Sequence, residues 1–447
     1  MTKENFNENS FEFISAATCS FTCIEKVKIK LLEEGYLQLY ENEKWNLDIG
    51  KYFVIRNDAS VIAFNIGKNH KESFNIICAH GDTPSFNLKP KNEIYEHNYL
   101  KLNVVPYGGI LNYGWMDRPL SIAGRIIYKE NEVYKRKIIN IDEPLCVIPS
   151  EAIHQNKTAN TNLDLNPQID LIPIISLSEE KDVIKSLLKK YLKFDSSITI
   201  CDYDLFLYNN DKPTYVGINN EMILSPRIDD LSCTFATFKS FIESNNEDNI
   251  NIMCIFNSEE IGSLTKEGAD SSFLLDTLKR ICAGINLDIS IVLHNSLIVS
   301  ADNSHAVHPN HPTKSDISNQ GFLNKGVLVV REKDTMTDSI SSTIFKEICR
   351  KADVPFQDYT SRNDMSTGST LSGLCIRHVS IDSIDVGIPQ LAMHSSNELM
   401  GSDDIFYLYK VFKKFYDVSI EHNSNNFKIL YWYLQTILFV VYLEHRK

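Results

Sequence analysis

Acidic residues and histidines follow several apolar runs of the sequence, at the points where those runs end. The clearest example is Glu259 and Glu260, which follow the apolar run 250–256 and precede a glycine. The full set consists of His80 with Asp82, Asp229 with Asp230, Glu259 with Glu260, Asp302, and His394. In α/β sheets, ligands bind beyond the carboxyl ends of the strands. We therefore treat these five segments as candidates for a single site.

A site crowded with carboxylates needs a cation. Carboxylates at close range raise one another's pKa, and burial raises the pKa values further. Two imidazoles and three carboxylates, one of them bridging, suit a pair of divalent ions such as zinc, cobalt or manganese. An Asp or Glu at a strand end is also a common helix N-cap, so each segment alone is more often structural. Only the joint pattern favours a metal site.

Two spacings indicate how the side chains divide their tasks. His80 and Asp82 are two residues apart and share a face if the chain is extended, so that Asp82 can orient the imidazole. Glu259 and Glu260 are adjacent and point in different directions if extended. One of them can then bind a metal ion while the other faces a substrate.

A further group of histidines, in the segment HAVHPNHP, also has spacing that suits metal binding. His305 and His308 are three residues apart, and His311 follows. We interpret this segment as a surface turn and leave it out of the candidate site.

The elements after residue 221 must position the candidate side chains. Helices are predicted at 231–243, 271–281, 339–352 and 403–416, strands at 250–256, 297–301 and 377–382, and extended chain at 285–293. Earlier in the chain, 11–36 has helical periodicity and 75–79 is a buried strand. The alternation predicts an α/β fold with helices on both faces of the sheet.

The character of the sequence changes between about residues 88 and 221. Segments 99–105, 122–128 and 137–141 are short, strand-like and separated by turn residues, and 179–191 has a helical pattern. We predict an inserted, mostly β domain in this stretch.

Composition excludes some classes of protein. The chain has 447 residues, enough for two or three domains, and a net charge of −13 with no basic stripe. This charge argues against nucleic acid and anionic membranes as main partners. Ten scattered cysteines without a CxxC pair, and a polar N-terminus without a signal core, favour a reducing cytoplasm.

The C-terminus carries an apolar tail. A polar linker at 421–426 precedes the apolar stretch 429–443, which Gln435 interrupts. The stretch is short for a membrane span, which needs about 20 residues. We favour a buried terminal helix or an oligomer contact over membrane attachment.

Taken together, the motifs resemble the aspartyl aminopeptidase and vacuolar aminopeptidase I family of dinuclear metallo-aminopeptidases. They occur in family order over residues 11–417, and the ordered set is far more specific than any single motif. The matching segments are HGDTP (80–84), YGGI (107–110) with WMDR (115–118), SPRIDD (225–230), NSEEIGS (257–263), SADNSHAVHPN (300–310), RND (362–364) with GST (368–370), and GIPQLAMHS (387–395).

The resemblance implies a role for each candidate residue. It implies that His80 and Asp302 hold one metal ion, that Glu260 and His394 hold the other, and that Asp229 bridges them. It further implies that Asp82 orients His80 and that Glu259 is the general base. The cofactor would be two divalent metal ions, with zinc first and cobalt or manganese as alternatives.

The resemblance also implies a domain arrangement and an assembly. Residues 1–88 and 221–420 would form a discontinuous catalytic metallopeptidase domain, 89–220 an inserted β-rich dimerisation domain, and 421–447 the linker and tail. His154 would reach into the active site of a partner subunit as an oxyanion donor. Dimers would build a dodecamer, and the substrates would be peptides with a free N-terminus.

The preferred N-terminal residue is a separate question. The resemblance places Arg362, Asp364, Lys325 and Val330 on the substrate side. Aspartyl-specific members are expected to carry a lysine where this chain has Val330, and an apolar side chain cannot neutralise an acidic one. Arg331 would face the other side of a strand. We therefore expect neutral or broad specificity.

Three alternatives stay open at this point. The first is a strictly aspartyl or glutamyl aminopeptidase. The second is another hydrolase on the same core, such as a carboxypeptidase or deacylase. The third is an inactive assembly or cargo scaffold, against which the complete ligand set argues, because an inactive copy would be free to lose a ligand.

Overall fold

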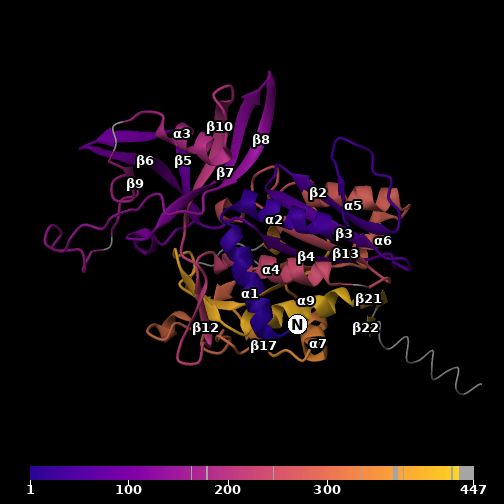
Figure 1. Ribbon diagram of the computed structural model, residues 1–447. Coiled ribbons are helices and arrows are strands. Elements are labelled where there is room, and N and C mark those ends of the chain that lie inside the picture. Colours follow the sequence, from indigo (N-terminus) through magenta and orange to yellow (C-terminus); the bar gives the residue numbers. More distant parts are fainter. Residues whose placement is uncertain are drawn as a thin grey trace, which may run out of the picture.

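A nine-stranded mixed sheet forms the centre of the part of the chain that the computed structural model describes (Figure 1). The described residues are 1–162, 164–177, 180–244, 246–333, 335–365, 371–375, 377–423 and 426–431. The strands, in spatial order, are β1 (Leu37–Leu39), β2 (Gly50–Arg56), β3 (Ser60–Ile66), β13 (Ile250–Phe256), β4 (Phe74–His80), β14 (Leu297–Ala301), β18 (Asp382–Gly387), β16 (Val327–Val330) and β17 (Phe356–Tyr359). Strands β13, β4, β14 and β18 are mutually parallel, so their carboxyl ends share one edge.

Helices cover both faces of this sheet, as the sequence predicts. One apolar core packs against α1 (Lys3–Ala16), α2 (Ser20–Glu33), α4 (Ile228–Ile242), α7 (Ser339–Lys351) and α9 (Asp404–Tyr416). The core on the other face packs against α5 (Phe273–Gly284), α6 (Ile289–His294) and α8 (Leu371–Cys375). The strands at the centre, such as β4 and β13, are buried along their whole length, because both of their faces are covered. The predicted α/β class is confirmed.

A second sheet forms a lobe that projects from the first (Figure 1). Its strands, in spatial order, are β8 (Val133–Asn140), β7 (Leu120–Glu130), β10 (Thr199–Asn209), β5 (Ser85–Glu96), β6 (Tyr99–Tyr107) and β9 (Ile174–Ser176). The helix α3 (Val183–Leu192) contributes Ile184 and Leu188 to the separate apolar core of this lobe. All these strands come from the continuous stretch 85–209, which overlaps the predicted insertion at 89–220.

A smaller sheet brings together segments that are far apart in the sequence. It consists of β11 (Thr214–Val216), β12 (Met222–Ser225), β20 (Glu398–Gly401), β19 (Pro389–Leu391) and β15 (Ser304–His305). The register pairs Ser225 with Glu398, so the chain that leaves β12 starts beside the first residue of β20. The sheet therefore holds the segments around 225–230 and 387–398 against each other.

Several predicted elements differ from those in the structure. The helical segment 11–36 is two helices, because the chain breaks at Ala17 and a new helix starts after Cys19, whose N–H binds the Thr22 hydroxyl. The segment 285–293 was expected to be extended but contains α6, whose N-cap Asp288 accepts a hydrogen bond from the N–H of Ser290. The strand expected at 377–382 lies further along as β18. A local cap or turn decided each of these cases.

The C-terminal region differs in a similar way. Residues 421–423 and 426 of the expected polar linker belong to a hairpin of β21 (Val418–Asn423) and β22 (Asn426–Tyr431). Most of the apolar tail, from residue 432 onward, lies outside the described residues, as does the GST motif at 368–370. Among the described residues, no helix is both long enough and apolar enough to cross a membrane.

Candidate metal centre and active site

Neighbouring parallel strands deliver three of the candidate segments to one edge of the central sheet. His80 is the last residue of β4, Glu259 and Glu260 follow β13, and Asp302 follows β14. The smaller sheet supplies the rest. Asp229 lies at the start of α4 directly after β12, and His394 lies in the turn between β19 and β20. The structure brings all of the predicted metal-ligand residues together: within each of three overlapping groups, the ligand atoms lie within 4.8 Å of one another.

The carboxylate of Asp229 lies between two sets of side chains. Its Oδ1 is 3.6 Å from Nε2 of His80, and that same nitrogen is 3.7 Å from Oδ1 of Asp302. Its Oδ2 is 3.4 Å from Nε2 of His394, which is also 3.4 Å from Oε2 of Glu260. One carboxylate therefore faces two separate pairs, each made of an imidazole and an acid.

These distances suit metal ligands better than hydrogen-bond partners. N–H···O hydrogen bonds span about 2.7–3.2 Å between heavy atoms. Two ligands on one tetrahedral ion, with bonds of about 2.0–2.2 Å, are about 3.4 Å apart. Among the described residues, the buried atoms Asp229 Oδ1 and Glu260 Oε1 also have no hydrogen-bond partner. The donor set therefore fits divalent metal ions.

Burial and mutual repulsion perturb the acids of the cluster. Burial raises the pKa of Glu259 to about 8 and the pKa of Asp302 to about 6. Burial, with repulsion from Asp229, raises the pKa of Glu260 well above its usual range. Burial lowers the pKa of His394, but contact with Asp229 outweighs this effect and the pKa rises to about 10. A divalent cation would relieve the repulsion, since it stabilises ionised carboxylates.

Asp82 supports the cluster by more contacts than its spacing predicts. Its backbone carbonyl lies 3.1 Å from Nδ1 of His80, closer than its carboxylate, which is 3.6 Å away. The carboxylate accepts hydrogen bonds from the backbone N–H groups of Glu259 and Glu260, both at 3.2 Å, and from the hydroxyl of Tyr107 at 2.8 Å. Asp82 thus ties the end of β4 to the glutamate pair.

The glutamate pair is not extended, so the opposite side-chain directions considered for an extended chain do not apply to it. Glu259 begins a single 3-10 turn that ends at Ile261, between Ser258 with φ of 64° and Gly262 with φ of 90°. The two carboxylates stay close in this turn, since one oxygen of each lies within 4.8 Å of the other and of a ring nitrogen of His80. Glu260 differs from Glu259 in a further contact, because its Oε2 also lies 3.4 Å from Nε2 of His394, in a second group that contains Asp229.

Two further residues support the cluster and were not predicted from the sequence to do so. Tyr107 donates its hydroxyl to Asp82, and Glu398 accepts hydrogen bonds from the backbone N–H groups of Asp229 and His394. Tyr107 belongs to a recognised motif, but only the fold shows its partner. For Glu398 the sequence shows only an acidic residue at the start of a mostly apolar strand segment, ELMG, and this does not indicate its partners.

None of the residues predicted for the substrate side is among the clustered acids and histidines. Arg362 and Asp364 form a bidentate ion pair with each other, with contacts of 2.8 and 2.6 Å. Lys325 is exposed. Val330 is 4% exposed and packs in a small apolar cluster with Leu328 and Tyr359.

Arg331 and His154, which the sequence also singled out, lie outside the metal cluster as well. Arg331 lines a cavity together with Val329, and so it diverges from Val330 as strand geometry predicts. His154 is exposed on a turn that follows β8.

A cavity of about 250 Å³ lies beside the metal cluster. Its lining includes His305, Ala392, Tyr359 and Met365, and Ala392 is two residues from His394. His305 lies on β15 and lines this cavity, so the interpretation of the whole segment HAVHPNHP as a surface turn is wrong for this residue. The prediction failed because the pairing of β15 with β19 joins distant parts of the chain.

The chain matches known proteins over most of its length. The model of the aminopeptidase I zinc metalloprotease (M18) family matches residues 13–416. A probable M18 family aminopeptidase 2 of Clostridium novyi is 40% identical, with 93% of this chain and 99% of that protein covered. A probable aspartyl aminopeptidase of Ricinus communis is 32% identical, with 92% of this chain and 95% of that protein covered.

The fold also matches solved structures. The S. cerevisiae mApe1 dodecamer is 26% identical, with a TM-score of 0.80, and the match covers 93% of this chain and 96% of that chain. The family match and the two relatives span the segments that build the cluster of acids and histidines. The chain therefore belongs to the aminopeptidase I zinc metalloprotease (M18) family and is a metallo-aminopeptidase, a hydrolase that acts on peptide bonds.

Proposed function

We propose that this aminopeptidase uses two metal ions to release N-terminal residues from peptides. The observation that carries the proposal is the carboxylate of Asp229, whose two oxygens face two different imidazole–acid pairs. His80 and Asp302 would hold one ion, and Glu260 and His394 the other, with Asp229 between them. Imidazole and carboxylate ligands suit zinc first, and cobalt or manganese as alternatives.

Glu259 is the proposed general base. When bound, a metal pair lowers the pKa of a water molecule and polarises the scissile carbonyl. Glu259 would take the proton of that water and deliver it to the leaving amine. Its place beside the ligands supports this role, because Asp82 holds the backbone N–H of Glu259. Asp82 also fixes the orientation of His80 through the contact at Nδ1.

The free α-amine of the substrate explains why cleavage starts at the N-terminus. An ammonium group is attracted to buried carboxylates, and this site is lined by several of them, among them the side chains of Asp229 and Glu260. An acetylated N-terminus carries no charge and is bulkier, so it would not bind in the same way. This property separates an aminopeptidase from a carboxypeptidase or deacylase on the same core.

We further propose that the preferred N-terminal residue is neutral, or that specificity is broad. Val330 is buried against Tyr359, and Arg331 lines a different cavity, so neither offers a cation to the pocket beside the cluster. The pocket lining contains one lysine, Lys314, and one aspartate, Asp316, whose charges offset each other. The alternative is strict acidic specificity, for which Lys314 would have to bind the substrate carboxylate.

A panel of aminoacyl substrates tests the specificity. We expect faster release of Leu and Met than of Asp and Glu, and no release from N-acetylated forms. The variant Lys314→Ala should leave the ranking unchanged, with Lys325→Ala as a control outside the pocket. Exclusive release of Asp and Glu, lost in Lys314→Ala but kept in Lys325→Ala, would establish the acidic alternative.

The proposed assembly is a dimer that builds a dodecamer in the cytoplasm. The lobe formed by 85–209 has its own apolar core, and its edge strand β8 is mostly exposed, which supports a dimerisation role for the insertion at 89–220. The dodecamer of the S. cerevisiae relative supports the larger assembly. His154 is exposed on this lobe, where it is accessible to a partner's active site.

Sedimentation and kinetics together test the assembly. We expect the wild-type protein to have the mass of a dodecamer. The variant His154→Ala should keep this mass, but its kcat should be lower by about 10²-fold, the decrease found for loss of one oxyanion donor. His97→Ala, at another exposed turn of the lobe, is the matched control. A monomer with full activity would contradict the proposal.

A further inference from the structure

A buried carboxylate outside the proposed ligand set connects two of the proposed ligands. Glu398 is 1% exposed. Its Oε2 accepts a hydrogen bond from the backbone N–H of Asp229 at 2.9 Å, and its Oε1 accepts one from the N–H of His394 at 2.7 Å. One rigid, planar group therefore fixes the backbone of two ligands that come from different segments of the chain.

The two N–H groups need such an acceptor because of the local backbone. Asp229 lies at the start of α4, where N–H groups have no partner within the helix, and its ψ of 112° is not helical. His394 has φ of 65° in the turn between β19 and β20. A buried N–H without a partner is costly, and a carboxylate is the strongest acceptor among side chains.

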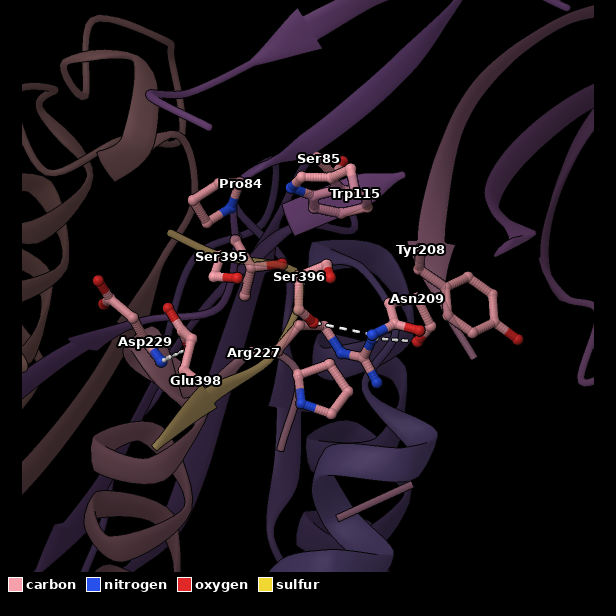
Figure 2. Close-up of a pocket in the computed structure, with 12 residues that line it drawn as sticks. Pro84, Ser85, Trp115, Tyr208, Asn209, Arg227, Asp229, Ser395, Ser396 and Glu398 are labelled. Carbon is pink, nitrogen blue, oxygen red and sulfur yellow. Dashed lines mark hydrogen bonds between the residues drawn. The ribbon is translucent and has the colours of Figure 1, made fainter. Parts of the chain in front are cut away.

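The fold places Glu398 where it can reach both groups. It is the first residue of β20, so it closes the turn that carries His394. It also pairs with Ser225 of β12, just before the segment that leads to Asp229. In Figure 2, Glu398 and Asp229 lie next to each other on the wall of a small cavity, joined by the hydrogen bond to the N–H.

We propose that Glu398 is a positioning residue that sets the separation of Asp229 and His394, and through it the affinity for the metal ion between them. This inference rests on the proposed two-metal site. The separation in question is the 3.4 Å between Oδ2 of Asp229 and Nε2 of His394. The ion held by Glu260 and His394 should therefore depend on Glu398 more than the ion held by His80 and Asp302.

The other end of the same strand offers a matched control. Asp404 is fully buried, and its carboxylate accepts hydrogen bonds from the N–H groups of Asn324 and Gly401. Neither of these partners is a proposed metal ligand. Asp404→Asn thus reproduces the loss of a buried acceptor next to β20 without touching Asp229 or His394.

The test is a metal titration of the metal-free protein and its variants. Cobalt binding is followed by its visible absorption, and zinc binding by competition with a chromogenic chelator. In Glu398→Gln an amide nitrogen replaces one of the two carboxylate oxygens, so one backbone N–H loses its acceptor. We expect the affinity of the protein for one of the two metal ions to fall about 10- to 100-fold. Asp404→Asn should keep both affinities. Equal affinities in wild type and Glu398→Gln would overturn the proposal, as would an equal loss in Asp404→Asn.

Folding is measured separately, by thermal unfolding of each metal-free variant. Glu398→Asp keeps the charge but is one methylene shorter, so it should also weaken the binding of one metal ion. This variant replaces Glu398→Gln in the test if Glu398→Gln does not fold. If neither Glu398 variant folds while Asp404→Asn does, Glu398 acts on stability and the proposal is wrong. Wild-type protein that binds fewer than two ions would instead reject the proposed two-metal site.

Discussion

Glu259→Gln is expected to lower kcat by about 10³-fold, within the range of roughly 10²- to 10⁴-fold known for general acid–base groups. The amide has nearly the same shape but cannot accept a proton from water. Both metal ions should stay bound, because Glu259 is outside the proposed ligand set. KM should change little. Turnover is measured with a chromogenic aminoacyl substrate, and metal content by elemental analysis of the same sample.

Glu267→Gln provides a matched control for that change. Glu267 is a buried glutamate on the same stretch of chain after β13, but its carboxylate accepts hydrogen bonds from Asn57 and Asn257 rather than facing the cluster. Its variant should keep turnover. Full turnover in Glu259→Gln with both ions bound would show that another group moves the proton.

Glu260→Ala should fail for a different reason, which is the loss of a metal ion. Its Oε2 is 3.4 Å from Nε2 of His394. The truncation therefore removes one carboxylate ligand from the metal ion proposed to bind Glu260 and His394. We expect the affinity for one ion to fall by at least about 100-fold, more than for loss of a group outside the ligand set. Turnover should be lost with that ion and partly restored by excess metal.

The neighbouring variant Glu259→Ala separates the two roles. It removes a carboxylate of the same type from the same turn, so it causes similar local disturbance. It should bind both ions and lose turnover that added metal does not restore. If both alanine variants lost metal equally, the assignment of separate tasks to the two glutamates would be wrong.

The sequence predicts the part of the site that depends on one sheet. His80, the glutamate pair and Asp302 all follow buried runs, and parallel strands bring their carboxyl ends to one edge. Binary pattern and length are enough to identify such strands, so this half of the cluster could be placed before the structure. The resemblance to known motifs supplied the assignment of roles.

The rest of the site depends on contacts that no local pattern encodes. Asp229 and His394 reach the cluster through the pairing of β12, β20 and β19, which joins distant segments. Glu398 could not be identified because its partners are backbone N–H groups, which leave no trace in the sequence. The 3-10 turn at Glu259 was missed since it depends on the left-handed conformation of Ser258, an uncommon choice for a residue with a Cβ.

The metal stoichiometry of the wild-type protein, measured together with its turnover, tests the central claim most directly. Metal-free protein is titrated with zinc while bound metal and release of the N-terminal residue are followed in parallel. The two-metal site predicts two ions per chain and full turnover only when both are bound. Full turnover without metal, or no binding at saturating zinc, would contradict it.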